Sequence, residues 1–130
     1  MPGSMRVLVP VDKLDTVRAE QLVALGYPAV AEVLPSLLEW VQDLNWPVAR
    51  ILQPFLATIG APLAPYIRDV LKTTDETWKW SVLQGVVGQS HELVESLRSD
   101  LRRLAESPTP SEVQEELQAL SQELLAGLRT

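Results

Sequence analysis

Prolines divide this chain into short segments, and this feature constrains its fold more than any other. Ten prolines occur among 130 residues. A proline inside a helix removes a backbone hydrogen bond, so each one is expected to begin, end or kink a helix. Between them, apolar residues recur every three or four positions, which is the spacing of one helix face. Only residues 6–11 could be extended, and Pro10 would make them an edge piece or a packed arm.

The apolar spacing predicts about seven helices. The first begins at a cap on Asp15 or Thr16 and ends before Gly26, which supplies a left-handed stop. After a short segment at 29–33, six more are expected at about 34–44, 47–59, 62–72, 75–86, 91–104 and 110–124. Thr74 and Ser90 are the expected caps of the fifth and sixth helices. The strongest local signal is Thr109-Pro110-Ser111-Glu112, a capping box that begins the last helix.

Two of the helix pairs share a layout. Asp43 precedes Trp46 by three residues, as Asp75 precedes Trp78, and each pair follows a helix with an early proline. The units cover residues 34–59 and 63–88, and residues 91–126 are a candidate third unit. Self-similarity of this kind is typical of stacked helical repeats.

The residues of the first unit resemble HEAT-type helical repeats, whose first helix often carries a proline and whose turn carries an aspartate. The closest stretch is Leu34-Pro35-Ser36-Leu37-Leu38, with Asp43 and the segment from Val48 to Arg50. Two longer blocks, Leu37 to Ala49 (LLEWVQDLNWPVA) and Asp75 to Trp80 (DETWKW), are similar to a bacterial family of short helical proteins of unknown function. That likeness extends from about Leu14 to Leu124. It implies a small all-helical, HEAT-like fold and no particular reaction or ligand.

The expected architecture is therefore all-α, a short HEAT-like right-handed stack of helical hairpins. One domain is expected at residues 14–128. Residues 1–13 are expected to comprise a cloning remnant, before a second methionine at Met5, and the extended arm.

Composition excludes several classes of function. The chain has no cysteine and one histidine, so disulfides, thiolate zinc sites and multi-histidine metal sites are excluded. A net charge of −6 argues against nucleic-acid binding, which depends on Lys and Arg. The longest uncharged run is short and broken by prolines, so no membrane span is expected. We expect a cytoplasmic protein, a monomer or weak homodimer, without a metal or cofactor.

Tryptophans and acids supply the candidate site residues. Trp40 and Trp80 could form an aromatic binding patch, whereas Trp46 and Trp78, at equivalent turns, are expected to join adjacent helices in the core. Glu39 and Asp43, four residues apart on one helix face, could act as paired carboxylates, with Asp75 brought close by stacking. Alternatively, the two aspartates simply cap the turns in which they lie. Lys79, between two tryptophans, could be a desolvated base or a cation–π donor, or could reach solvent along apolar surface.

Acidic residues are also concentrated near the end of the chain. Glu112, Glu115, Glu116 and Glu123 would share the last helix and could present an acidic face to a cationic partner.

Two hypotheses of function follow. The first is a non-enzymatic protein-interaction module, and in its most specific version an immunity-type inhibitor of a cationic toxin or enzyme. The candidate interaction residues are Trp40, Asp43, Asp75, Lys79, Trp80, Glu112, Glu115 and Glu116. The alternative is a small-ligand-binding protein or enzyme with a cleft lined by Trp40, Asp43, Asp75, Trp78 and Lys79.

Overall fold

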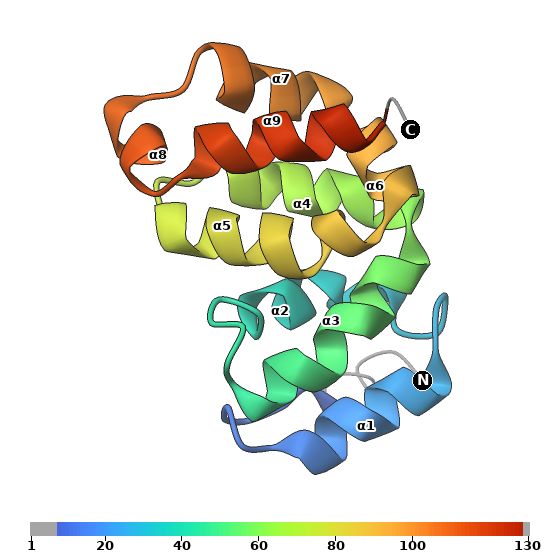
Figure 1. Cartoon of the computed structure of the whole chain (residues 1–130). Coiled ribbons are helices and arrows are strands. Elements are labelled where there is room, and N and C mark those ends of the chain that lie inside the picture. Colours follow the sequence, from blue (N-terminus) through green and yellow to red (C-terminus); the bar gives the residue numbers. More distant parts are fainter. Residues whose placement is uncertain (1–7, 129–130) are drawn as a thin grey trace.

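The computed structural model describes residues 8–128, and within this range the chain is all-α, with no strand (Figure 1). Three short 3₁₀ helices join the longer elements: η2 (Ala31–Val33), η3 (Ala61–Leu63) and η4 (Val87–Gln89). The α-helices are α1 (Thr16–Leu25), α2 (Leu34–Glu39), α3 (Pro47–Ile59), α4 (Ala64–Leu71), α5 (Glu76–Gly85), α6 (His91–Ser96), α7 (Arg98–Glu106), α8 (Pro110–Gln114) and α9 (Leu117–Gly127).

Local signals set most of the helix boundaries. The Asp15 carboxylate accepts from the Arg18 N–H at the start of α1, and Gly26 ends that helix with a φ of 73°. Ser90 caps α6, and the capping box at Thr109 is complete. One expected cap was wrong: Asp75, and not Thr74, accepts from the Trp78 N–H at the start of α5. Aspartate is a more favourable N-cap than threonine, so α5 is capped by Asp75 rather than by the preceding Thr74.

Three of the expected helices are shorter than the apolar spacing predicted. α2 ends at Glu39, so the segment up to Asn45 is a series of turns. The expected helix at 91–104 is interrupted at Leu97, between α6 and α7. The expected helix at 110–124 breaks at Glu116, which adopts a left-handed conformation with φ 65°. Apolar spacing continues across these breaks because the helices on either side bury the same face.

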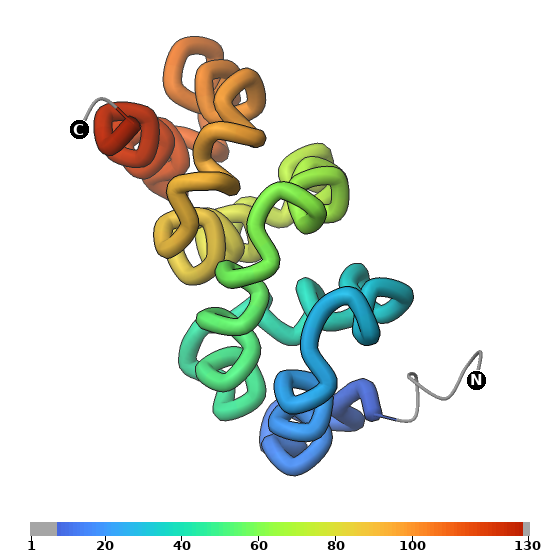
Figure 2. The backbone as a smooth tube through the Cα atoms, turned by 90° about the vertical axis from the view of Figure 1, so that its right-hand side faces the viewer, coloured from blue at the N-terminus to red at the C-terminus, as the bar shows by residue number. Residues whose placement is uncertain are grey.

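The helices are stacked broadly in the order of the chain, except that the last helix, α9, contacts both α5 and α7. Figure 1 shows α1 at one end of the molecule and α7, α8 and α9 at the other, with α2 to α5 between them. Figure 2 shows the same succession after a quarter turn. α7 packs most extensively against α9, and α1 against α3, while α5 contacts both α4 and α9.

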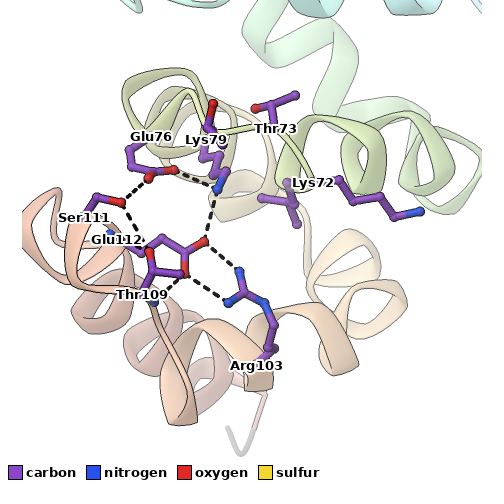
Figure 3. Close-up of a pocket in the computed structure, with 10 residues that line it drawn as sticks. Lys72, Thr73, Glu76, Lys79, Arg103, Thr109, Ser111 and Glu112 are labelled. Atoms are coloured by element: carbon purple, nitrogen blue, oxygen red, sulfur yellow. Dashed lines mark hydrogen bonds and ion pairs between the residues drawn. The ribbon is translucent and has the colours of Figure 1, made fainter.

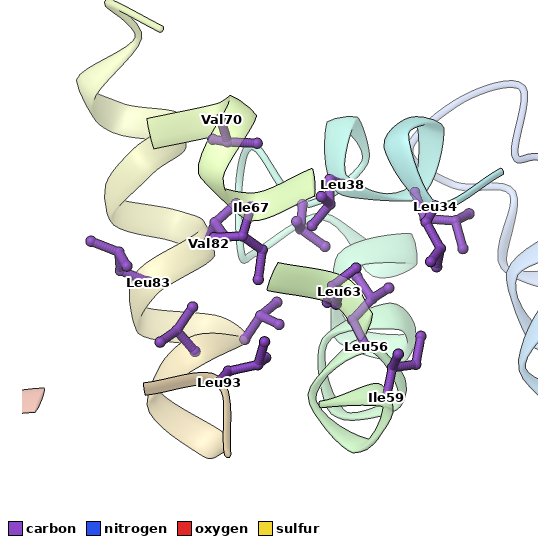
Figure 4. Packing of buried hydrophobic residues seen from close by; sticks show 14 of the residues in the cluster. Leu34, Leu38, Leu56, Ile59, Leu63, Ile67, Val70, Val82, Leu83 and Leu93 are labelled. Atoms are coloured by element: carbon purple, nitrogen blue, oxygen red, sulfur yellow. The ribbon is translucent and has the colours of Figure 1, made fainter. Parts of the chain in front are cut away.

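A continuous apolar core runs through the stack. Figure 4 shows its middle part, where four side chains converge: Leu38 of α2, Leu63 of η3, Ile67 of α4 and Val82 of α5. All four side chains are buried. Trp46 and Trp78, expected in the core, are only half-buried and pack against its edge.

The N-terminal expectations are tested only in part. Residues 1–4, the expected cloning remnant, lie outside the described residues, as does the start of the expected arm. From residue 9 to residue 14 the backbone forms turns, bends and irregular structure, and not a strand. Pro10 is buried, and Val9 packs against the core, so the described part of the arm is packed. In residues 8–128 the helices are too short and too polar to cross a membrane.

Candidate functional site

A depression of about 670 Å³ lies where α5 meets the connection between α7 and α8 (Figure 3). Hydroxyl and charged side chains dominate its walls. The lining residues are Leu71, Lys72, Thr73, Thr74, Glu76, Lys79, Arg103, Thr109, Ser111 and Glu112.

Lys79 lies at the bottom of this depression and is 4% exposed. Its Nζ is 2.7 Å from Oε1 of Glu76, one turn earlier on α5, and 3.0 Å from Oε2 of Glu112 on α8. Both carboxylates form ion pairs with the Lys79 ammonium, so this side chain is engaged within the protein. Neither a surface position nor the expected contact with the neighbouring tryptophans is observed.

Glu112 is also buried, with 2% exposure, and it accepts hydrogen bonds from three sources. Arg103 donates through both terminal nitrogens, at 3.0 and 2.7 Å, the Thr109 N–H donates at 2.8 Å, and Lys79 completes the set. The bidentate Arg103 guanidinium, then the Thr109 N–H and Lys79, hold the pKa of Glu112 at about 2 despite its burial. Glu112 therefore does not contribute to an exposed acidic face, contrary to the sequence-based expectation.

Four side chains form a continuous series of ion pairs, Glu76–Lys79–Glu112–Arg103, that we call the charge clasp. The Ser111 hydroxyl donates to Glu76, and the Lys79 ammonium and this hydroxyl lower the pKa of Glu76. Two carboxylates are balanced by two cations, so the network is neutral. Because each carboxylate is held ionised by fixed partners, the clasp favours a structural link between α5, α7 and α8 over acid–base chemistry.

The structure does not bring the residues of the predicted cleft to one place. Trp78, Lys79 and Trp80 are consecutive on α5, and successive side chains on a helix diverge by about 100°. Trp78 points to α2, where its Nε1–H donates to the Leu38 carbonyl oxygen at 2.9 Å. Trp80 instead lines a separate hollow with Gln114, Glu115 and Glu116, whereas Lys79 belongs to the clasp.

Asp43 and Asp75 are engaged by their own turns. The Asp43 carboxylate accepts from the Asn45 N–H at 2.8 Å, and Asp75 caps α5. Both residues are exposed. Trp40 stacks edge-on against Trp46, with 5.9 Å between the ring centroids. Over residues 8–128 no group of three acidic or histidine side chains is placed to hold a metal ion.

Six of the predicted interaction residues nevertheless lie on turns and helices that neighbour one another along one side of the stack. Figure 1 shows the turn after α2, the turn between α4 and α5, and α8 on the left-hand side of the molecule. The turn after α2 contacts α5, since the Ser81 hydroxyl donates to the Gln42 carbonyl oxygen. α5 in turn carries Trp80, which borders the α8–α9 turn. We call this surface the loop edge and define it by Trp40, Asp43, Asp75, Trp80, Glu115 and Glu116.

Sequence reasoning missed Glu76, Arg103 and Ser111 as partners in the clasp. One signal was present: Glu76 and Lys79 are three residues apart on one helix, a spacing that brings opposite charges together. The contacts of Arg103 and Ser111 depend on how the last helices pack, and no local pattern predicts them.

Comparison with known proteins gives a family and no function. A family model described as a domain of unknown function (DUF5071) matches residues 8–125. No curated protein matches the chain. Because the match covers nearly the whole sequence, the chain belongs to this family of domains of unknown function.

Proposed function

We propose that this protein is a non-enzymatic interaction module that binds a protein partner through the loop edge. The observation that carries this proposal is the contrast between two groups of charges. In the depression beside α5, the charges of Glu76, Lys79, Arg103 and Glu112 neutralise one another inside the charge clasp. On the loop edge, Glu115 and Glu116 make no ion pair with any residue between 8 and 128.

The chemistry of the loop edge favours a cationic partner. Four carboxylates and two half-buried tryptophans contribute to it, in a chain whose net charge is −6. Carboxylates attract a basic surface over long distances, and tryptophan provides large contact area at binding hot spots. A stack of helical hairpins, as the resemblance to HEAT-type repeats implies, is commonly used for protein binding. An immunity-type inhibitor of a cationic toxin or enzyme is the most specific form of this proposal.

Affinity capture with paired charge reversals tests the proposal. The wild-type protein should retain one stoichiometric basic protein from a lysate of its source. Glu115→Lys with Glu116→Lys should abolish this capture, because both changes place like charges against the partner. The matched control is Glu32→Lys with Glu95→Lys, which reverses two exposed carboxylates in η2 and α6, outside the loop edge. Equal capture by the two double variants would contradict the loop edge as the binding surface.

The alternative, a small-ligand or enzyme cleft, is weakened by the separation of its residues. The Trp78 indole donates to α2, Lys79 lies in the charge clasp, and the two aspartates are engaged by their own turns. Thermal-shift screening against metabolites distinguishes the two ideas. A metabolite that raises the Tm of the wild-type protein, but not that of a folded Trp40→Ala variant, would favour the alternative and contradict a purely protein-binding role.

A further inference from the structure

We propose that the hollow beside Trp80 is a subsite for the guanidinium group of one arginine side chain presented by the partner. This inference deepens the proposed function and rests on it. The hollow is lined by Trp80, Gln114, Glu115 and Glu116 and has a volume of about 300 Å³. That space accommodates a single long side chain rather than a whole peptide segment.

The hollow combines an indole, an amide and two carboxylates, which together suit a guanidinium group. Trp80 is half-buried, and the structure gives its indole no ring contact or side-chain hydrogen bond within residues 8–128. Gln114 adds an amide oxygen that can accept a hydrogen bond. A planar guanidinium can stack on an indole face while its N–H groups donate to carboxylates at the ring's edge.

The negative charges of Glu115 and Glu116 are not balanced by a cation within residues 8–128. Three basic residues line the neighbouring depression. Arg103 and Lys79 are paired with Glu112 and Glu76 in the charge clasp, and Lys72 makes no ion pair with any residue between 8 and 128. Glu115 and Glu116 consequently receive no cation from the described part of the chain. A hollow with two unneutralised carboxylates and an aromatic wall is complementary to a cation and would repel a carboxylate or phosphate.

The charge clasp also holds the two walls of the hollow in place. The clasp fixes α8 to α5 through the Lys79–Glu112 pair, and Trp80 is the next residue along α5. Both walls of the hollow are therefore set by the same buried contact. A preformed subsite loses less conformational entropy on binding than one that must order its walls first.

Nα-acetyl-arginine amide is the probe for this subsite. The protein is labelled with ¹⁵N at its tryptophans, and the indole N–H signals are followed by NMR during titration. The Trp80 signal is assigned by its loss in Trp80→Phe. We expect that signal to shift saturably, with a Kd in the millimolar range, and the signals of the other tryptophans to shift much less.

Two controls make the test specific. Nα-acetyl-citrulline amide has the same shape without the charge and should produce almost no shift. Glu115→Gln with Glu116→Gln should weaken arginine binding about fivefold, while Glu39→Gln with Glu123→Gln, which neutralises two exposed carboxylates elsewhere, should leave it unchanged. Equal shifts with the two probes, or full binding by the Glu115/Glu116 variant, would overturn the subsite.

The probe requires no partner, so the two proposals fail separately. Partner capture that depends on the loop edge, combined with no response of Trp80 to arginine, would overturn the subsite and leave the interaction module standing. A Trp80 response that needs both glutamates supports the subsite even where the capture experiment fails.

Discussion

Lys79 shows how a buried charge contributes to stability only through its partners. Removing the ammonium while keeping the aliphatic chain, in Lys79→Met, would leave Glu76 and Glu112 facing each other with one cation fewer. We expect a loss of about 3 kcal/mol in the free energy of unfolding, measured by urea denaturation. Lys72→Met is the matched control: Lys72 is exposed at the rim of the same depression, so its effect should stay within about 0.5 kcal/mol. Similar values for the two variants would contradict the clasp.

Glu112 makes the stability depend on pH. Arg103 above all, with the Thr109 N–H and Lys79, lowers its pKa from 4.5 to about 2 in the folded state. A carboxyl with a lowered pKa stabilises the fold fully above its unfolded pKa, and this contribution disappears as the pH falls from about 5 towards 2. Glu76, whose pKa is also lowered, acts in the same direction.

The pH effect is measured against Glu112→Gln, which cannot ionise. At neutral pH the wild-type protein should be more stable than this variant, and the difference should shrink by about 3 kcal/mol as the pH falls to 2. Urea denaturation at a series of pH values provides the comparison. A difference that stays constant over this range would mean that Glu112 is not held ionised by the clasp.

At the scale of the elements, the break between α8 and α9 depends on one backbone conformation. Glu116 has φ 65°, where a residue with a side chain is strained, while Glu115, with φ −86°, is not. Glu116→Gly should therefore raise the free energy of unfolding by about 0.5–1 kcal/mol, although glycine is costly elsewhere. Glu115→Gly should lower it by a similar amount. Thermal denaturation of the two variants tests this, and destabilisation by both would contradict the left-handed turn.

For the whole molecule, the stacked helices are joined by specific polar contacts as well as by the core. The Trp78 indole N–H of α5 donates to the Leu38 carbonyl oxygen of α2, while the Trp80 indole donates to no residue in the described part of the chain. Trp78→Phe should lose about 1 kcal/mol, because the hydrogen bond between the layers is lost, although the Leu38 carbonyl oxygen still accepts from the Val41 N–H. Trp80→Phe should stay within about 0.5 kcal/mol. Urea denaturation measures both, and equal effects would show that the hydrogen bond does not join the layers. Because Trp78 is half-buried, we expect Trp78→Ala to cost less than truncation of a fully buried tryptophan.

More of the fold than of the candidate site could be predicted from the sequence. The all-α class, the capping box and most helix boundaries were predicted, and the left-handed stop at Gly26 is confirmed. The interruptions at Leu97 and Glu116 were not predicted, because a helix that turns can keep the same face buried. Among the candidate residues, Glu112 was expected at the surface and is buried. The capping-box pattern fixed its backbone role but could not reveal Arg103 and Lys79 as partners.

The sequence by itself determined most of the helix boundaries, because caps, prolines and glycines act through hydrogen bonds and dihedral angles of residues within one turn. Only the tertiary structure decided which charges are neutralised. The Lys79–Glu112 pair joins residues on different helices, and its 3.0 Å separation exists because α5 and α8 are packed together by the core. The same packing leaves Glu115 and Glu116, beside Trp80, without an ion pair to any residue from 8 to 128, a distinction between neighbouring acids that no local pattern contains.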